Sequence, residues 1–372
     1  MAVHPSSRIA ECFVDLVDPR IARTRRHALL DIITIALCGV ICGAESWVEV
    51  EDWADAKLEW LQTWLELPNG IPSHDTFGRV FSRINPAQFE AGFLRWVQGV
   101  AVATAGAVLA IDGKTVRAAR ALNGSPLHVV SAWASTNRLV IGQEAVELKS
   151  NEITAIPILL ARLDLHQQVV TIDAMGCQRS IAAQIVAQGG DYVLALKDNH
   201  PDLATNVQDS FALATADPAR QSTSVGKGHG RIEIRTCRTI TDPETLAWLD
   251  PEGAWDGLRS LAMVESERRV NGVVTRKTRY YLSSLAGEAK VIAAAVRSHW
   301  GIENQLHWVL DVAFREDASR AHVGHSAENL ALLRKLALNL LRIEPTRKHG
   351  VKASRLRAGW DTTYLLRVLG VN

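Results

Sequence analysis

The sequence predicts an α/β protein in which an all-helical N-terminal domain precedes a mixed sheet with flanking helices, interrupted by a β-rich insertion. Three observations support this. Apolar residues repeat at helical spacing over the first hundred residues. After residue 106, short apolar runs of strand length alternate with helical stretches. Residues 198–286 are polar and rich in turns, and helical periodicity returns after them.

The helical N-terminal domain is expected at residues 1–100. The most apolar run, Ile32–Ala44, has 13 residues, too few to span a bilayer, and predicts a buried core helix. A second helical pattern extends from Val48 to Leu65. Ser73 is the expected N-cap of a third helix, and Pro86 introduces a fourth.

Residues 107–197 should form the first part of the core. Three short-linked strands predict an antiparallel meander, and the later strand–helix–strand steps require parallel crossovers. Such a mixed sheet with helices is the pattern of a ribonuclease-H-like fold. The expected elements are strands at 107–112, 127–133, 139–142, 169–173 and 192–196, and helices at 153–163 and 180–188.

The chain after residue 197 divides into three further regions. The insertion at 198–286 carries strand-like pieces at 231–236, 261–264 and 278–282. Residues 287–345 complete the core with an apolar helical stripe from Ile292 to Val309 and a last helix at 327–341. Residues 346–372 form a basic C-terminal segment.

Composition is that of an ordinary globular chain, with 47% apolar and 22% charged residues and a net charge of +1. An enzyme acting on nucleic acid must therefore gather its basic residues locally, because phosphate contacts supply most non-specific affinity. From residue 315 to the end, Lys and Arg outnumber Asp and Glu by 11 to 5. The five cysteines match no zinc or redox spacing, so free thiols in a cytoplasmic protein are expected. The first residues also lack the pattern of a signal peptide.

Two of the expected strands end in an aspartate, at Asp112 and at Asp173. Acids at strand ends of such a sheet lie where ligands commonly bind, and Gly113 allows a close approach of backbone or ligand. For each acid alone, a turn-forming or helix-capping role is the alternative.

A third acid, Glu303, lies on an expected helix. His299, Glu303 and His307 are spaced by four and therefore line one side of that helix. The flanking Trp300 and Trp308 argue against a freely solvated carboxylate. One alternative is a polar seam at a domain contact, and another is a zinc site. Zinc hydrolases usually pair a His–Glu dyad with a His one turn away, an arrangement absent here.

Seven motifs occur in order along nearly the whole chain: Gly70-Ile-Pro-Ser-His-Asp-Thr-Phe77, Ile111-Asp-Gly-Lys114, Asp173-Ala174, Leu196-Lys-Asp-Asn199, His229-Gly-Arg-Ile-Glu233, His299-Trp-Gly-Ile-Glu-Asn304, and Leu310-Asp-Val312 with Phe314, Glu316 and Asp317. This ordered set resembles the DDE transposases of bacterial insertion sequences, specifically the H-repeat-associated, ISAs-type family within the IS-four superfamily. The superfamily inserts a β-rich piece before its final catalytic helix, as expected here.

The resemblance implies that Asp112, Asp173 and Glu303 are the catalytic acids of a transposase that cuts DNA at terminal inverted repeats and joins the 3′-hydroxyl ends to target DNA. We hypothesise that Asp112 bridges two Mg²⁺ (or Mn²⁺) ions and that Asp173 and Glu303 each hold one. Hard cations favour carboxylate oxygens, and two of them roughly 3.5–4 Å apart can assist phosphodiester hydrolysis.

One departure concerns the wider superfamily's Tyr-x2-Arg-x3-Glu-x6-Lys signature, whose positions hold Val296, His299, Glu303 and Leu310 here. The phosphate contacts that Tyr and Lys make in relatives therefore cannot be assigned in this chain.

Several further residues are candidate DNA contacts, each with a solvated or packing role as its alternative. They are Lys114, Lys197, Asn199, His229, Arg231, His299, His307, Arg315 and Arg320. The expected partners are terminal repeats, which the helical N-terminal domain is a candidate to recognise, target DNA and, because two ends must be paired, a second copy of the chain. The expected place is the bacterial cytoplasm at the nucleoid, with no membrane. Two other functions stay open: an inactive or domesticated DNA-binding protein, and a nuclease without strand transfer.

Overall fold

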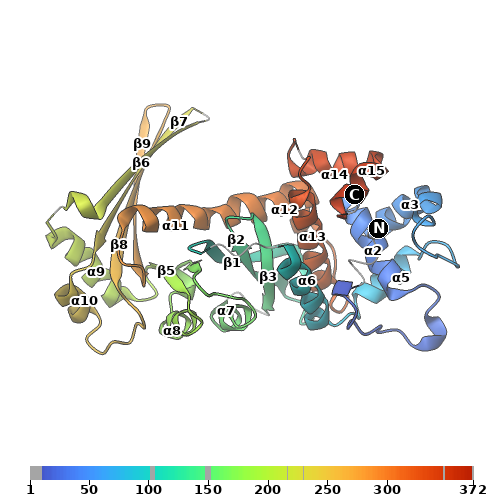
Figure 1. The fold of residues 1–372 in the computed structure, drawn as a ribbon, viewed down its shortest axis with the longest axis horizontal. Helices are drawn as coiled ribbons and strands as arrows, with labels where there is room; N and C mark the ends of the chain where they lie inside the picture. The colour runs from blue at the N-terminus through green and yellow to red at the C-terminus, as the bar shows by residue number, and fades with distance from the viewer. Residues whose placement is uncertain are drawn as a thin grey trace.

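A computed structural model describes residues 11–100, 105–146, 152–215, 217–228, 230–346 and 348–370. The molecule is elongated (Figure 1). Helices from both ends of the chain gather at one end of it, a sheet occupies the middle, and a β-ribbon projects from the other end.

The expected N-terminal helices are all present, with the second stretch divided at Lys57. Ser73 occupies the N-cap position of its helix, but its side chain accepts no capping hydrogen bond; its Oγ instead lies 3.2 Å from Thr76 Oγ1. The helices are η1 Ala22–Thr24, α2 Leu29–Cys42, α3 Trp47–Ala56, α4 Leu58–Leu61, α5 His74–Phe81 and α6 Pro86–Val100.

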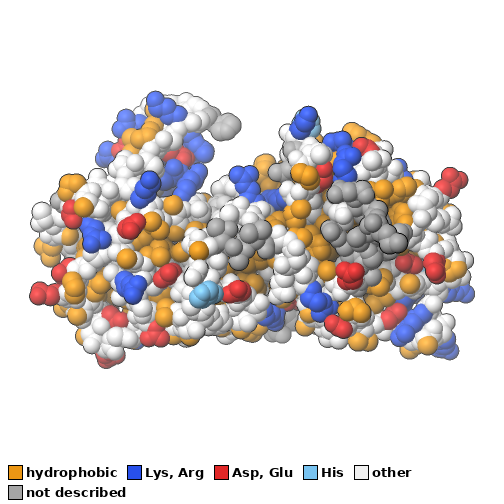
Figure 2. Space-filling view, viewed as in Figure 1, with side chains coloured by type: hydrophobic (Ala, Val, Ile, Leu, Met, Phe, Trp, Pro, Cys, Tyr) orange, Lys and Arg blue, Asp and Glu red, His pale blue; other side chains and the backbone are white. Residues whose placement is uncertain are grey.

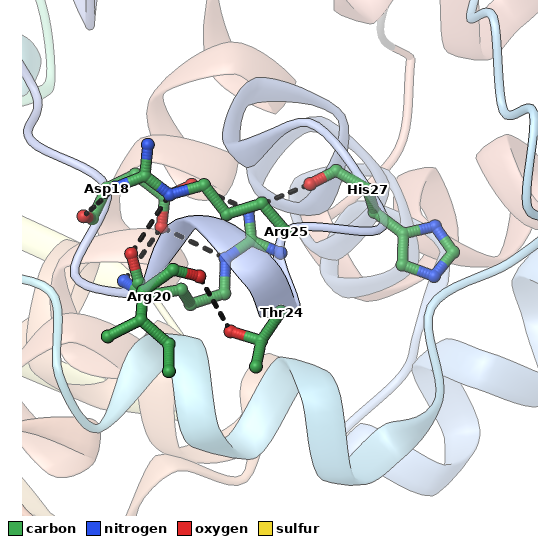
Figure 3. A network of polar contacts seen from close by, with 6 residues as sticks. Asp18, Arg20, Thr24, Arg25 and His27 are labelled. Atoms are coloured by element: carbon green, nitrogen blue, oxygen red, sulfur yellow. Dashed lines mark hydrogen bonds and ion pairs between the residues drawn. The ribbon is translucent and has the colours of Figure 1, made fainter.

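A polar network fixes the loop that leads into α2 (Figure 3). Arg20 donates from Nε and Nη2 to the Asp18 carboxylate at 3.0 and 2.7 Å, and from Nη2 to the His27 carbonyl at 2.8 Å. Arg25 Nε in turn donates to the Arg20 carbonyl at 2.9 Å. Because Arg20 is only 8% exposed, this pairing replaces the water that the guanidinium loses on burial.

Among the described residues, nine strands form one mixed sheet in the order β3-β2-β1-β4-β5-β9-β8-β7-β6. As expected, the first three strands form an antiparallel meander, and β1, β4 and β5 run parallel. The strands of this part are β1 Val108–Arg120, β2 Pro126–Ala134, β3 Leu139–Val146, β4 Val169–Ile172 and β5 Asp191–Leu196.

Helices cover both faces of these central strands. On one face, α7 (Glu152–Leu160) and α8 (Arg179–Ala187) pack against residues such as Ile111 and Val170. On the other face, α11 (Ala289–Gly301) packs against Val169 and Val193. The chain turns from β4 into α8 through the short helix η3 Ala174–Gly176.

The insertion continues the same sheet, because β9 pairs antiparallel with β5. Three of its strands were expected, and each extends beyond the residues over which it was predicted. One strand, β6, and two helices, α9 and α10, were not expected. The elements are α9 Pro201–Leu213, η4 Pro218–Arg220, β6 Gln221–Gly228, β7 Arg231–Ile240, α10 Pro243–Leu249, β8 Ser260–Val270 and β9 Val273–Ser283. The outer parts of β6–β9 form the projecting ribbon (Figure 1).

The C-terminal helices share one apolar core with the N-terminal helices. Leu333, Leu336 and Leu341 pack in the same cluster as Ile33, Leu37 and Phe77. Buried Arg355 also ties the two parts together, donating from Nη2 to the Val40 carbonyl at 2.7 Å. The elements after α11 are the π-helical turn η5 Ile302–His307, α12 Trp308–Phe314, η6 Glu316–Ala318, α13 Ser326–Ile343, α14 Val351–Trp360 and α15 Thr362–Val368.

The five cysteines all carry free thiols, as expected. Across the described ranges, no single helix is long and apolar enough to cross a membrane; α2 and α3, bent by 94°, meet the length and composition criteria only as a pair. Residues 1–10, where no signal peptide is expected, lie outside the described residues.

Candidate active site

The two aspartates lie side by side on neighbouring strands. The parallel ladder between β1 and β4 ends at the pair Ile111 and Ile172, so Asp112 and Asp173 are the next residue on each strand. Asp173 does follow the end of β4, and its Oδ1 accepts a hydrogen bond from Met175 N at 3.1 Å. The expectation that Asp112 ends its strand is wrong. Asp112 pairs with Ser131 of β2, and β1 continues to Arg120, because that antiparallel partner is longer than β4.

The helical segment that carries the third acid crosses the same strands. His299 Nδ1 lies 3.0 Å from Thr171 Oγ1 on β4, and His307 Nδ1 lies 3.5 Å from Asp112 Oδ2 on β1. Glu303, between the two histidines, lines a cavity together with Asp173. The spacing by four therefore does direct this set toward the sheet. The turn itself is π-helical, a local widening of the helix that is frequent at functional sites.

The charges of the three acids act on one another. Burial, followed by the negative charges of Asp173 and Glu303, raises the pKa of Asp112 to about 8, although the Gly113 N–H donates to its carboxylate at 3.0 Å. Burial and Asp173 also raise the pKa of Glu303, against the opposing effect of Arg279. Carboxylates such as Asp112 and Glu303, whose pKa is raised by neighbouring acids, form a site that favours a bound cation.

Both histidines beside the acids are neutral. Burial lowers the pKa of His299 to about 4. Burial, with the nearby Lys114 and Lys335, lowers the pKa of His307 to about 3. His307 Nε2 is buried, and within the described residues it has no hydrogen-bond partner. A neutral imidazole beside Asp112 adds no positive charge to the site.

A cavity of about 550 Å³ opens beside Asp173 and Glu303. Its walls come from β4, β5, β9 and α11, so the insertion contributes one side of it. Cations from three positions, Lys197, Lys277 and Arg279, line the cavity, and Arg279 stacks over the Trp300 ring at 4.8 Å. Lys277 and Arg279 were not among the candidates, because an exposed strand in a polar insertion gives no local sign that it reaches the site.

No cluster of three or more His, Cys, Asp or Glu side chains that could hold a metal ion is found in the part of the chain that the structure describes. The zinc site considered for His299, Glu303 and His307 is therefore not supported. The carboxylates of Asp112, Asp173 and Glu303 form no such cluster either, but the raised pKa of Asp112 and of Glu303 and the oxygen donors of all three fit a hard divalent cation.

Lys114 is held by acids from the C-terminal part of the chain. Its ammonium binds the carboxylate of Asp311, lies 2.8 Å from Glu316 Oε2 and lies 3.7 Å from Asp317 Oδ1. Lys114 is 12% exposed and Glu316 only 2%, so this ion-pair cluster is largely buried. Two of the sequence motifs, about 200 residues apart, meet in it.

The remaining candidate DNA contacts are scattered. Asn199 donates to the Cys177 carbonyl at 3.3 Å, and Arg231 lies 3.1 Å from Glu233 at the start of β7. Arg315 lies 3.1 Å from Glu45, and Arg320 lines a separate cavity of about 160 Å³ next to α2 and α3. His229 lies outside the described residues.

A basic face on the ribbon was also missed. Cys237, Val264 and Arg279 are paired across β7, β8 and β9, and their row lies on the side of the ribbon that packs against α11. Because strand side chains alternate between faces, every second residue toward the tip lies on that side. These positions hold five cations and one acid, whereas the opposite side holds three cations and two acids. The α11 side carries Arg231, Arg235, Arg268, Lys277, Arg279 and Glu233; the other carries Lys227, Arg269, Arg276, Glu265 and Glu267.

A buried polar pair lies behind Gly113. His128 Nε2 lies 2.6 Å from Glu152 Oε1, and His128 Nδ1 lies 2.9 Å from Thr115 Oγ1. A Cβ on Gly113 would lie 2.4 Å from Glu152 Oε1 and 2.6 Å from His128 Nε2. Glycine is therefore required here by this pair, on the sheet face opposite to Asp112.

Comparison with known proteins shows the family of the chain. The family model described as "Transposase DDE domain" matches residues 104–340, and the one described as "DDE_Tnp_1-associated" matches residues 10–97. The chain is 42% identical over 354 residues to "Putative transposase YncI" of Escherichia coli O157:H7, covering 92% of this chain and 90% of that protein. It is 38% identical over 351 residues to "H repeat-associated putative transposase YhhI" of Escherichia coli strain K12, covering 92% of each.

Among solved structures, a piggyBac transposase synaptic complex with hairpin DNA aligns with 99% of this chain and 81% of that chain, at a TM-score of 0.47 and 11% identity. The family match spans well over half of the chain, and the relatives are matched over nearly their full length. The chain therefore belongs to the DDE transposases of bacterial insertion sequences, in the H-repeat-associated family of the IS-four type.

Proposed function

We propose that this protein cleaves DNA at the terminal inverted repeats of an insertion sequence and joins the 3′-hydroxyl ends to target DNA, with Asp112, Asp173 and Glu303 as the catalytic acids. The observation that supports the proposal is that Asp112 and Asp173 follow one register pair on neighbouring strands, and that Glu303 lines a cavity together with Asp173. They lie close enough for Asp173 and Glu303 to raise the pKa of Asp112. Isolated surface acids would not do so, because water screens them.

A ribonuclease-H-like core is part of the proposal. Support comes from the order β3-β2-β1-β4-β5, in which β2 is antiparallel to both neighbours and the next three strands are parallel. The domain boundaries expected from the sequence stay predictions. The shared core of the N- and C-terminal helices favours a single body at that end of the molecule.

DDE transposases use divalent metal ions, and we propose two Mg²⁺ or Mn²⁺ ions held by Asp112, Asp173 and Glu303. Bound there, the ions would supply activation of water and stabilisation of the charge that develops on phosphate oxygens. The chain's own contribution is to orient the donors. His307 and the Gly113 N–H flank the Asp112 carboxylate, and the Met175 N–H orients that of Asp173.

The DNA would lie over α11, between the ribbon and the C-terminal helices. The outline of the molecule is hollowed there, and Lys and Arg side chains gather on the ribbon (Figure 2). The basic face of the ribbon leads down to the cavity that Glu303 lines, through Lys277 and Arg279. Phosphate contacts of this kind position DNA without reading its sequence. Lys197 and Arg231 suit the same role, while Arg315 and Arg320 would need a second stretch of DNA.

Pairing two ends requires two active sites, so we propose a homodimer on DNA, acting at the nucleoid in the cytoplasm. A cleavage assay on a labelled fragment carrying the element's end tests the catalytic proposal. Asp112→Asn, Asp173→Asn and Glu303→Gln should each abolish metal-dependent cleavage, while Asp209→Asn, an exposed acid on α9, should not. Retained cleavage in any of the three removes that residue from the site.

Two further measurements separate the alternatives. Joined product on a labelled target distinguishes a transposase from a nuclease without strand transfer, and DNA binding without any cleavage indicates an inactive protein. A thermal shift reports the metal independently of activity. Mg²⁺ at 100 times its dissociation constant should stabilise the chain by about 2.7 kcal/mol, and Asp112→Asn should lose most of that gain.

A further inference from the structure

A second groove lies on the other flank of the helix that carries Glu303. It has a volume of about 330 Å³ and is formed by η5, α12, the turn between β2 and β3, and the start of α14. This volume lies at the lower end of the range of about 300–1,000 Å³ for small-molecule sites. The groove therefore suits one flat group, not a folded protein segment.

The chemistry of the groove is aromatic and cationic. Its floor is apolar, from Val309, Val312 and Val351, and Trp308 stands at its edge with 61% of its surface exposed. Its charged residues are all cations, and none of its lining residues is an acid: Arg138, Arg342 and Lys352. No acid within the described ranges forms an ion pair with Arg138 or Lys352, and both are exposed. This combination complements a base with its phosphate.

One of the cations is held in a strained position. Arg138 has a φ of +56°, a conformation that costs an ordinary residue roughly 1 kcal/mol or more. Arg342 fixes it there: its Nη1 donates to the Arg138 carbonyl at 3.0 Å, its Nη2 donates to the Gln305 carbonyl, and its guanidinium stacks over Trp133 at 4.6 Å. Glycine or asparagine would suit this turn better, so the position favours a function for the Arg138 side chain.

We propose that this groove binds an unpaired nucleotide of the DNA strand that leaves the catalytic cavity, with its base stacked on Trp308 and its phosphates near Arg138 and Lys352. The inference rests on the proposed function in taking DNA as the partner. A duplex is too wide for the groove and keeps its bases stacked inside, whereas an unpaired base offers its face to an indole.

The position of Trp308 fits a strand that passes through the active site. Glu303 and Trp308 are five residues apart on one continuous helical run, roughly 7 Å along its axis. That distance corresponds to about two stacked nucleotides of one strand. A strand that passes from one flank of the helix to the other would therefore be held at Trp308 within a few nucleotides of the phosphate that Glu303 faces.

Fluorescence anisotropy of labelled DNA tests the proposal on the full chain, in EDTA so that no cleavage occurs. The probes are a blunt duplex and the same duplex with a five-nucleotide oligo-dT extension. Trp308→Ala should weaken binding of the extended probe on the order of tenfold and leave the blunt probe within twofold. Trp308→Phe should retain most of the affinity, and Trp248→Ala, another exposed tryptophan on α10, should change neither probe.

Lys352→Gln gives a second test that leaves the aromatic side chain unchanged. For the extended probe alone, it should reduce the slope of log affinity against log salt concentration by about 0.7. Equal affinities of the Trp308→Ala and unaltered chains for the extended probe, or equal losses on both probes, overturn the proposal. Either result leaves the catalytic proposal intact if Asp112→Asn still abolishes cleavage. Absence of any DNA binding by the unaltered chain refutes both.

Discussion

Replacing Lys114 with Met should destabilise the protein by several kcal/mol. Lys114 is the cation shared by Asp311, Glu316 and Asp317, and Glu316 is almost fully buried. Removing one partner of a buried ion pair typically costs about 3–5 kcal/mol, because the remaining charge stays buried without compensation. Lys335 and Arg334 also act on Glu316, and Asp311 and Asp317 are partly exposed, so we expect about 3 kcal/mol.

Thermal unfolding converts this loss into a measurable shift. At about 2.1 cal/mol/K per residue, 372 residues give an unfolding entropy of about 0.8 kcal/mol/K, so 3 kcal/mol lowers the Tm by about 4 °C. Lys197→Met is the matched control, because Lys197 is 72% exposed and its ion pair is with the exposed Asp198; its Tm should change by less than 1 °C.

A double-mutant cycle with Glu316→Gln identifies the cause. If the unpaired carboxylate is responsible, adding Glu316→Gln to Lys114→Met should cost less than the two single losses together. Additive losses, or a Lys114→Met chain that melts within 1 °C of the unaltered protein, would refute the reasoning.

The same pair gives a pH signature with a definite sign. Burial alone would raise the pKa of Glu316, but Lys114, Lys335 and Arg334 outweigh it and hold that pKa below its usual 4.5. A carboxylate with a lowered pKa stabilises the fold above its unfolded pKa and loses that contribution as the pH falls. The difference in stability between the unaltered and Lys114→Met chains should therefore shrink as the pH falls from about 4.5 through this lowered pKa.

Three further predictions concern other parts of the site. Gly113→Ala should cost about 1–3 kcal/mol in urea unfolding, because its Cβ meets the buried His128–Glu152 pair, whereas Gly99→Ala on α6, with open space around it, should be neutral or slightly stabilising. The unfolded chain protonates His299 below about pH 6.5, but the folded chain does so only near pH 4. The free energy of unfolding should therefore fall by up to about 1.4 kcal/mol per pH unit as the pH drops between these values. His299→Gln should remove that slope. Lys277→Gln should reduce the salt slope of duplex DNA binding by about 0.9, while Arg276→Gln, on the opposite ribbon face and paired with Glu267, should change it little.

Local patterns were sufficient to predict the central sheet. Its strands are short apolar runs between turns, and the short links predicted the antiparallel meander before the parallel crossovers. The expected order of three strands, helix, strand, helix and strand matches the structure. The helix of Glu303 was predicted because apolar residues on its sheet side repeat at helical spacing.

Elements stabilised mainly by pairing were missed. The polar run after Asp112 suggested the end of a strand, but hydrogen bonding to β2 extends β1 through Gly113 and beyond. The ribbon strand β6 is almost entirely exposed and contains Gly226 and Gly228, so neither burial nor side-chain preference marks it as a strand. The contacts of Lys114 lie about 200 residues away, a separation at which no spacing rule applies.

The Lys114 cluster also explains how Asp112 can remain without compensation by the lysine on its own strand. Lys114 lies two residues after Asp112 on the same strand and hence on the same face. An ammonium beside Asp112 would lower its pKa and compete with any metal ion for its oxygens. Instead, three carboxylates from the C-terminal part hold Lys114, and the groups that act most strongly on Asp112 are other acids. A ring nitrogen 3.5 Å from its carboxylate belongs to the neutral His307. The fold thus keeps Lys114 paired and leaves Asp112 to a cation from solution, which favours the metal-dependent chemistry proposed here.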